Sequence, residues 1–426
     1  MYNIYIETYG CSANQNNSEI IKGLLSRLGF CIVASEKNAD VVIVNTCIVK
    51  GPTLQKMFSR IKSIRKKVIV AGCMADVPAQ VFRIKKLNEK ISFVGSHHVK
   101  DIGKAVADVI NGKQGLLVEP NDEVKLCMPK MRENNVIGIT QILEGCLGDC
   151  SYCITRFAKG RLFSYPKEQI LKNIKADLAA GCKEIWITSQ DNAAYGLDLK
   201  GKYRLPDLIN DILKIKGNFR VRLGMMNPNH VVSMLRELIE CYKDERMYKF
   251  LHIPVQAGSD QVLKSMNRKY KVRDFVKIVS EFRKHFPDMM LSTDIICGYP
   301  TETSDNFRET LELVKQIQPD VVNISRYWPM PGTPAALLEQ LLSDEVMKRS
   351  NALSRMFTDI ISAKNQKFVG SNVECLADKR GFDDTWLCRD DNYRLVAVRS
   401  QGKLLGKIIL ARIKKSFAHY LIGEII

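Results

Sequence analysis

Hydrophobic and polar positions divide the chain into three regions of different character. From residue 1 to about 115, apolar runs such as "DVVIVNTC" alternate with amphipathic stretches such as "SEIIKGLLSRLGF". Such apolar runs predict buried strands, and their alternation with helices predicts a parallel sheet covered on both faces. We therefore expect the α/β fold class, with a doubly wound parallel sheet over residues 1–115 and a linker without clear period over residues 116–135.

The second region, residues 136–362, repeats the strand-and-helix alternation. Helical patterns such as "PKEQILKNIKADLAAGC" separate the strands. Six strand–helix units predict a partial or full (β/α) barrel, in which the chemistry gathers at the C-terminal ends of the strands. The expected strands are "IGITQILEGC", "KEIWITSQD", "FRVRLGMMNP", "FLHIPVQAG", "MMLSTDIICGYP" and "VVNISRYWP".

The third region, residues 364–426, consists of short strand patterns broken by Gly, Asp and Asn, such as "TWLCRDD" and "RLVAVRS". This pattern is typical of a small all-β barrel. The region holds more Lys and Arg than Asp and Glu.

Composition narrows the choice of partner and compartment. The 426 residues are 46% hydrophobic and 26% charged, which is typical of a soluble globular protein. A net charge of +18 favours an acidic partner, most often nucleic acid, although a merely basic protein is the alternative. The first residues alternate like a strand and lack the apolar core of a signal peptide, and no run reaches the roughly 18 apolar residues of a membrane helix. We therefore expect a cytoplasmic protein that does not bind membranes.

We do not expect the 13 cysteines to form disulfides, because the cytosol keeps thiols reduced, and we interpret the clustered ones as metal ligands. Three of them, Cys146, Cys150 and Cys153, stand in "EGCLGDCSYC" with C-x3-C-x2-C spacing, at the end of the first predicted barrel strand. An ordinary iron–sulfur or structural zinc site uses four ligands. Three thiolates on a [4Fe–4S] cluster would leave one iron open for a substrate or cofactor. The alternative is a zinc or redox site with a distant fourth ligand.

Three more cysteines follow apolar strands in the first region. Cys11 ends "ETYGC", Cys47 ends "VIVNTC" and Cys73 ends "VIVAGC", and Gly10 and Gly72 permit close backbone approach. Because parallel strands end at one edge of a sheet, these thiols can converge on a second three-cysteine site. The alternative is that each is an ordinary buried cysteine. The pair His97–His98 fits a solvated or capped loop better than a metal site.

The C-x3-C-x2-C motif on the first loop of a (β/α) barrel resembles the radical S-adenosylmethionine (SAM) enzymes. Over essentially its whole length the chain also resembles the methylthiotransferase family. The motifs that carry this resemblance are "YGCxxNxxxSE", "NTC", "AGC", "GCxxxCxYC", "HIPVQAGSDQVLKSMNR", "TDIICGYPTET" and "RYWPMPGTPA". The C-terminal region resembles the TRAM domain, an RNA-binding module.

The resemblance implies two [4Fe–4S] clusters and SAM as cofactors. The cluster on Cys146, Cys150 and Cys153 would generate a 5′-deoxyadenosyl radical from the SAM bound to its open iron. The N-terminal cluster, on Cys11 and its two partners, would hold the sulfur to be inserted, and a second SAM would methylate that sulfur. The expected SAM contacts are Tyr152, Gln190, Asp191, Gln256, Ser259, Gly298 and Pro300. Each of them could instead be a strand-end cap or turn former.

Members of this family modify either tRNA or a ribosomal protein. "NTCIVKGPT" and "GRLFSYP" resemble the archaeal and eukaryotic branch, which places a methylthio group on carbon 2 of threonylcarbamoyl-adenosine beside the anticodon. Methylthiolation of isopentenyl-adenosine in tRNA or of a protein side chain are the alternatives, and a non-enzymatic RNA-binding iron–sulfur protein is a third. The implied partners are tRNA, an electron donor and a sulfur source. Nothing in the sequence demands more than a monomer.

Overall fold

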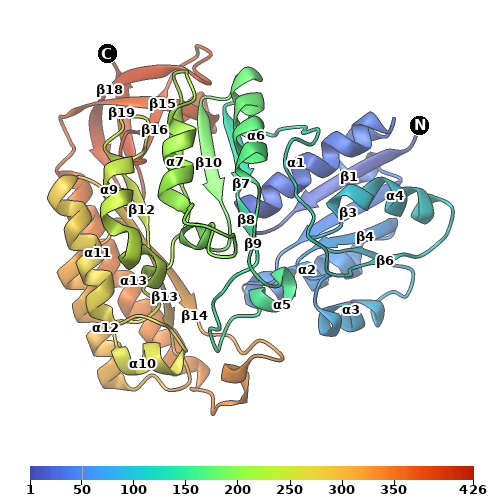
Figure 1. Ribbon diagram of the computed structural model, residues 1–426, viewed down its shortest axis with the longest axis horizontal. Coiled ribbons are helices and arrows are strands. Elements are labelled where there is room, and N and C mark those ends of the chain that lie inside the picture. The colour runs from blue at the N-terminus through green and yellow to red at the C-terminus, as the bar shows by residue number, and fades with distance from the viewer. Residues whose placement is uncertain (50) are drawn as a thin grey trace.

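The computed structural model describes residues 1–49 and 51–426, so Lys50 of the "NTCIVKGPT" motif lies outside the described residues. The chain forms three parts (Figure 1). An N-terminal sheet with its helices lies beside a larger central core, and a C-terminal barrel packs on one end of that core. None of the described helices is both long and apolar enough to cross a membrane.

The N-terminal part is a six-stranded parallel sheet with the strand order β2-β1-β3-β4-β5-β6. Its strands are β1 (Asn3–Thr8), β2 (Cys31–Val33), β3 (Val41–Thr46), β4 (Lys67–Gly72), β5 (Ser92–Val94) and β6 (Leu116–Leu117). Its helices are α1 (Ser12–Arg27), α2 (Gly51–Ser63), α3 (Pro78–Lys85) and α4 (Ile102–Ile110).

Alternate residues of the central strands point to opposite faces of this sheet. Val42 and Val44 pack with residues of α2 and α3, whereas Val41 and Ile43 pack with residues of α1 and α4. All six residues of β3 are buried, as expected of an interior strand with a helical layer on each side. The predicted doubly wound sheet is therefore confirmed.

The core contains the six predicted strands in two three-stranded parallel sheets, which a bridge between Val221 and Met247 connects. The strands are β7 (Ile137–Gln141), β10 (Glu184–Thr188), β11 (Arg220–Leu223), β12 (Phe250–His252), β13 (Met290–Cys297) and β14 (Val321–Arg326). The main outer helices are α6 (Lys167–Ala179), α7 (Leu205–Leu213), α9 (Leu235–Tyr242), α11 (Val272–His285), α12 (Ser304–Ile317) and α13 (Ser343–Gln366). Within the described residues β7 and β14 do not pair, so the barrel is partial. Helix α1 packs beside the open edge at β7.

The C-terminal part is a closed barrel of five strands in the order β15-β16-β17-β19-β18. The prediction of a small all-β barrel is therefore confirmed. The strands are β15 (Asn372–Arg380), β16 (Thr385–Asp390), β17 (Leu395–Arg399), β18 (Ile408–Ser416) and β19 (Leu421–Ile425). Small barrels of this kind close on themselves and so leave no open sheet edge.

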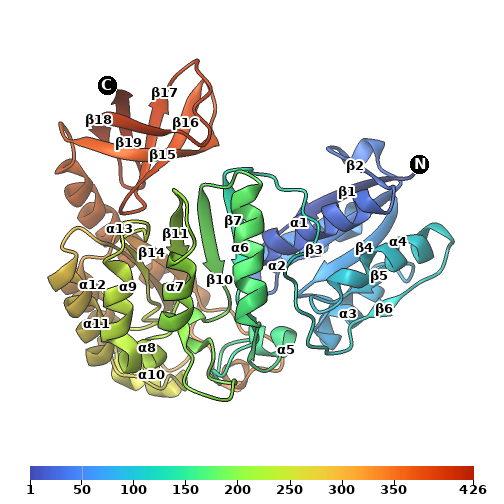
Figure 2. The ribbon, with the colours of Figure 1, turned by 45° about the horizontal axis from the view of Figure 1, so that its top comes forward.

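The C-terminal barrel docks on the N-terminal ends of the core strands. Arg220, the first residue of β11, pairs with Asp391 at 2.9 Å, and the Lys249 amide just before β12 donates to the Asp391 carbonyl at 2.8 Å. Arg394 donates to the carbonyl of Asp288, just before β13, at 2.7 Å. Figure 2 shows this barrel at the opposite end of the core from the short helices α5 (Thr155–Lys159) and α10 (Asp260–Ser265).

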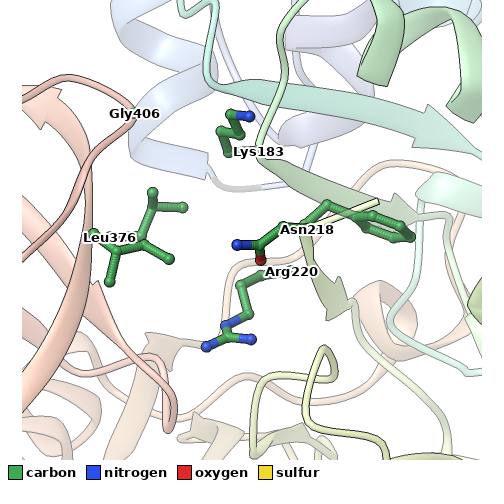
Figure 3. Close-up of a pocket in the computed structure, with 7 residues that line it drawn as sticks. Lys183, Asn218, Arg220, Leu376 and Gly406 are labelled. Carbon is green, nitrogen blue, oxygen red and sulfur yellow. The ribbon is translucent and has the colours of Figure 1, made fainter. Parts of the chain in front are cut away.

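A cavity of about 240 Å³ lies at this docking interface (Figure 3). Lys183, Asn218 and Arg220 line it from the core, and Leu376 and Gly406 line it from the C-terminal barrel. Because it lies at the N-terminal ends of the strands, it is remote from the edge at which a (β/α) barrel carries its chemistry. The cavity is therefore a packing gap between two parts of the chain rather than the predicted active site.

Candidate functional site

The C-x3-C-x2-C cysteines lie at the C-terminal rim of the core. Strand β7 leads into the short strand β8 (Leu143–Glu144), and Gly145 then turns the chain with φ of +74°. A side chain at Gly145 would collide with the backbone of Arg161, so glycine is required for this turn. Cys146 follows directly, and the loop ends where α5 begins at Thr155.

The first two thiols of this loop face a common point. The Gly148 amide donates to Cys146 Sγ at 3.1 Å, and a Cβ added to Gly148 would lie 3.2 Å from Cys146 Sγ and 3.6 Å from Cys150 Sγ. Burial raises the pKa of the Cys146 thiol to about 12 despite this amide. Binding to a metal overrides such a shift, because coordination deprotonates the thiol.

The donor set fits a [4Fe–4S] cluster, which takes thiolates that are spread around a body larger than a single ion. Three half-buried thiols in one loop, with a backbone amide aimed at one sulfur, meet that requirement.

Arg268 is a residue of this site that sequence reasoning missed. Its Nη1 donates to Cys150 Sγ at 3.1 Å, and its guanidinium lies over the Tyr270 ring, 4.9 Å from the centroid. Its Nη2 donates to Asn227 Oδ1, and Asn227 Nδ2 donates in turn to Asp191 Oδ2 at 2.9 Å. A cation is thus held against the Cys150 thiol by a chain of hydrogen bonds that starts at Asp191. The sequence signal for this residue is its place at the end of "HIPVQAGSDQVLKSMNR", one of the motifs that carry the family resemblance.

Two of the residues expected to contact SAM follow strand β10. The Asp191 carboxylate is fully buried and accepts hydrogen bonds from the Ala193 amide and from the amide and side chain of Asn227, and it pairs with His230 Nδ1 at 2.8 Å. Asp191 therefore orients its neighbours. Gln190 Oε1 is buried and has no hydrogen-bond partner within the described chain. A buried polar atom of this kind is usually satisfied by a ligand or water, which fits the amino group of SAM.

The other expected SAM contacts lie at the ends of β12 and β13. Gln256 has φ of +69°, and its backbone bonds to Asp294 and Ile296 of β13. Ser259 Oγ accepts from Asn306 at 3.0 Å, and the Gly298 amide donates to Glu302 at 2.8 Å.

The expected SAM contacts at the ends of β12 and β13 also fix the conformation of the backbone at the rim of the core. Gly298 has φ of +76°, and a side chain there would press on Val346. Pro300 follows in the same turn, and Tyr152 packs against the apolar group that contains Tyr299. Their contacts with SAM stay a prediction.

The three N-terminal cysteines follow neighbouring strands. Cys47 and Cys73 come directly after β3 and β4, and Cys11 comes three residues after β1, so all lie at one edge of the sheet. Asn14 ties their loops together, because its Nδ2 donates to the carbonyls of Tyr9 at 2.7 Å and of Thr46 at 2.8 Å.

Contacts around Asn14 and Gly10 bring these loops close together. The Cys73 thiol lies 3.9 Å from Asn14 Oδ1, and a Cβ on Gly10 would lie 3.0 Å from Cys47 Sγ. The sequence-based expectation that these thiols approach one another therefore has a geometric basis.

The N-terminal edge faces the rim of the core. Ser12, next to Cys11, has its Oγ 2.7 Å from Thr188 Oγ1 at the end of β10. One apolar cluster includes Cys47 and Cys73 together with Ile154 and Ala158, which directly follow the loop of the core cysteines. The two three-cysteine groups therefore occupy neighbouring positions on the same side of the molecule.

Comparison with known proteins gives two family matches. Residues 140–314 match the radical SAM superfamily, and residues 3–95 match a family described as Uncharacterized protein family UPF0004. A "Probable threonylcarbamoyladenosine tRNA methylthiotransferase" of Pyrococcus horikoshii is 41% identical over 433 residues and covers 100% of both chains. One from Methanothermobacter thermautotrophicus is 38% identical with 99% of each chain covered. The Homo sapiens "Threonylcarbamoyladenosine tRNA methylthiotransferase" is 34% identical, over 99% of this chain and 73% of the human protein.

Solved structures agree on the fold. The radical S-adenosylmethionine methyltransferase TsrM from Kitasatospora setae superposes with a TM-score of 0.58 at 14% identity, covering 79% of this chain and 75% of that chain. The cobalamin-dependent S-adenosylmethionine radical enzyme OxsB gives 0.53 at 12% identity, covering 83% and 56%. At such identities the likeness concerns the arrangement of strands and helices alone.

Proposed function

We propose that the chain adds a methylthio group to carbon 2 of threonylcarbamoyl-adenosine beside the anticodon of tRNA. The reason is that the chain belongs to the threonylcarbamoyladenosine tRNA methylthiotransferase family. The observation that carries this proposal is the full-length identity with relatives of that name. The pairing of a radical SAM core with a UPF0004 region in one chain supports it.

Within the core, Cys146, Cys150 and Cys153 would hold the [4Fe–4S] cluster of the radical SAM superfamily. When bound, this cluster supplies the electron that cleaves SAM to methionine and a 5′-deoxyadenosyl radical. The chain's own part is to orient the reactants. Arg268 fixes the Cys150 thiolate through its donated hydrogen bond, and Gln190 Oε1 offers an acceptor for the SAM amino group. Fixed donors and acceptors of this kind reduce the reorganisation needed during reaction.

Cys11, Cys47 and Cys73 would hold a second [4Fe–4S] cluster, whose open iron would carry the sulfur to be inserted. Support comes from their positions on adjacent strands and from the Asn14 bridge between two of their loops. The contact between Ser12 and Thr188 sets this edge against the rim of the core, where the substrate carbon would be activated. Two open sites that face one substrate atom suit a reaction that needs both a radical and a sulfur donor.

The proposed tRNA substrate agrees with the net charge of +18. Lys and Arg side chains that neutralise phosphates give affinity that falls as salt rises. We place the reaction in the cytoplasm, in a monomer, with an external reductant and an external sulfur source. A single chain carries both cysteine groups, so no second copy is needed to complete a site.

Nucleoside mass spectrometry of tRNA from a deletion strain tests the substrate. The strain should lose the 2-methylthio form of threonylcarbamoyl-adenosine, and the wild-type gene should restore it. The Cys150→Ala and Cys47→Ala variants should not restore the modification. Normal levels in the deletion strain would contradict the proposal, and loss of the isopentenyl form instead would transfer the activity to that adenosine.

Iron analysis tests the two-cluster proposal separately. After anaerobic reconstitution the wild-type chain should hold about eight iron atoms, which is two [4Fe–4S] clusters. Changing either trio to alanine should leave about four. A wild-type chain that never exceeds four would contradict the second cluster.

A further inference from the structure

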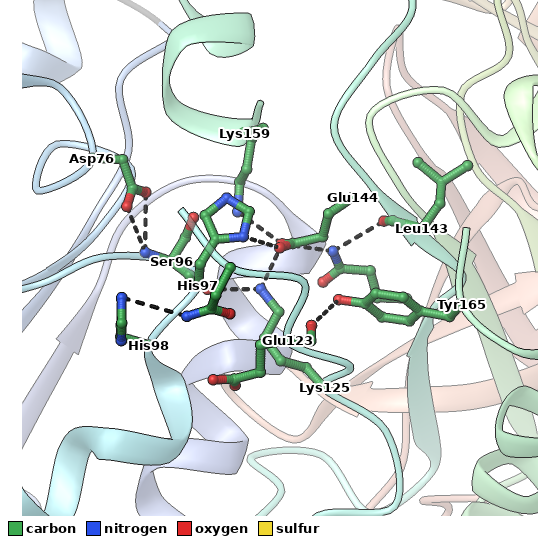
Figure 4. A network of polar contacts seen from close by, with 12 residues as sticks. Asp76, Ser96, His97, His98, Glu123, Lys125, Leu143, Glu144, Lys159 and Tyr165 are labelled. Atoms are coloured by element: carbon green, nitrogen blue, oxygen red, sulfur yellow. Dashed lines mark hydrogen bonds and ion pairs between the residues drawn. The ribbon is translucent and has the colours of Figure 1, made fainter. Parts of the chain in front are cut away.

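A buried ionic network joins the N-terminal part to the two ends of the C-x3-C-x2-C loop (Figure 4). Glu144 is at its centre, with a side chain only 2% exposed. Its Oε1 accepts from Lys125 Nζ at 2.5 Å, from Lys159 Nζ at 3.1 Å and from Gln141 Nε2 at 2.8 Å. Its Oε2 faces His97 Nδ1 at 3.2 Å. One carboxylate is therefore shared by two buried lysines.

The network joins all the parts of the chain that meet at the site. Lys125 belongs to the connection after the N-terminal sheet, and it also donates to the carbonyl of Ser96 at 2.8 Å. The Ser96 amide donates to both carboxylate oxygens of Asp76, each at 3.0 Å, in the N-terminal part. Glu144 and Lys159 belong to the core, just before and just after the cysteine loop.

Such an arrangement is costly, since each buried ion must be compensated within the protein. Glu144 offers a single negative charge to two ammonium groups. Two lysines therefore contact one carboxylate, and the network can accept a further anionic partner.

The cysteines of the N-terminal edge lie on the side of Lys159. Helix α5 carries Lys159, and the preceding Ala158 packs in the same apolar cluster as Cys47 and Cys73. The electrostatic neighbours of Lys159 include Cys73 and Cys11 in addition to Glu144. The leading electrostatic partners of Lys125 are Glu144, Lys159 and Glu123, none of them a cysteine.

We propose that Lys159 is a positioning residue of the N-terminal site, whose fixed charge compensates the thiolates of a cluster bound there and raises its reduction potential. This inference rests on the proposed second cluster. Three thiolates give an oxidised [4Fe–4S] cluster a net negative charge, and reduction adds another. A buried cation favours the more negative state, because electrostatic interactions are strong where water is excluded. The N-terminal site would then be completed by a side chain of the core.

The test uses the full-length chain with Cys146, Cys150 and Cys153 changed to alanine, so that all iron belongs to the N-terminal site. After anaerobic reconstitution, a redox titration followed by electron paramagnetic resonance gives the ratio of reduced to oxidised cluster. In this background Lys159→Met should lower the ratio of reduced to oxidised cluster on the order of tenfold at fixed potential. For a one-electron couple this change corresponds to a reduction potential lower by about 59 mV. Lys159→Arg should titrate like the parent, because it keeps the charge.

Lys125→Met is the matched control, because it removes an equally buried lysine side chain from the same carboxylate. It should leave the ratio within about twofold of the parent. Lys159→Gln removes the charge but keeps a donor for Glu144, so it should shift the ratio like Lys159→Met even if the latter folds poorly. Unchanged titration of both neutral Lys159 variants, or an equal shift in Lys125→Met, would overturn the role of Lys159. A parent that binds no iron would overturn the second cluster itself, and with it this role.

Discussion

Truncation of Tyr393 tests how the C-terminal barrel is held on the core. This side chain is only 7% exposed, and its ring lies 4.9 Å from Tyr248 and 5.1 Å from Phe250 between centroids. It also contacts two guanidinium groups, those of Arg222 at 5.4 Å and Arg389 at 4.7 Å. Tyr393 therefore carries much of the aromatic contact between the two parts.

Replacement of a buried aromatic ring by alanine costs about 3–5 kcal/mol. Because the Tyr393 ring contacts the core, much of this loss falls on the docked state. Since each 1.4 kcal/mol is a factor of ten, a loss of about 3 kcal/mol lowers the ratio of docked to undocked barrel roughly 100-fold. Tyr393→Phe keeps the ring and should be close to the wild type.

The Lys249 amide reports docking directly, because it donates to the carbonyl of Asp391 in the C-terminal barrel. Hydrogen exchange followed by mass spectrometry should show faster exchange around Lys249 in Tyr393→Ala than in Tyr393→Phe. Exchange within β7, in the other three-stranded sheet and at its edge away from β11, should change much less. Equal exchange at Lys249 in the two variants would refute the view that this ring holds the barrel in place.

Three further predictions concern single residues. Burial raises the pKa of Glu184 to about 7 in the folded chain, whereas it is about 4.3 in the unfolded chain. The contribution of Glu184 to the free energy of unfolding is therefore complete below about pH 4 and is lost as the pH rises through 7. Urea titrations from about pH 5 to 8 should therefore show a smaller decline for Glu184→Gln than for the wild type, and an identical decline would contradict the shift. Arg268→Met should slow 5′-deoxyadenosine formation by roughly 10- to 100-fold, since a hydrogen bond to a charged group contributes about 1.5–3 kcal/mol. Arg268→Lys should be intermediate, and unchanged SAM cleavage in Arg268→Met would exclude the role. Gly10→Ala should reduce iron in the N-terminal site, because φ of +108° and the 3.0 Å approach to Cys47 Sγ both oppose a side chain there. An iron content equal to that of the wild type would show that the loop adapts, and Gly112→Ala, in open space at φ of +75°, is the control for backbone strain alone.

Much of the fold follows from apolar patterning. The run "DVVIVNTC" predicts an interior strand because a strand with helices on both faces needs apolar residues at every position, and all six residues of β3 are buried. The same principle places Cys47 and Cys73 at one edge, since parallel strands end together. Local sequence therefore suffices where a residue's position depends only on the strand that it follows.

Other parts of the site depend on contacts between distant segments. Arg268 reaches Cys150 across 118 residues, and nothing near either residue specifies that approach. Lys159 lies on a helix of five residues, which is too short to have a readable period. The docking of Tyr393 likewise depends on the packing of the C-terminal barrel against the core, which no strand pattern encodes.

The position of the C-terminal barrel has a consequence for substrate size. It sits at the N-terminal ends of the core strands, whereas the cysteines lie at or near the C-terminal ends. The longest core strand, β13, has 8 residues, and at about 3.3 Å per residue it spans about 26 Å. A free nucleoside or a short loop can occupy only one end, while a folded RNA long enough to pass around the core can engage both. Chain length of the RNA, as much as its sequence, would then separate substrates from non-substrates.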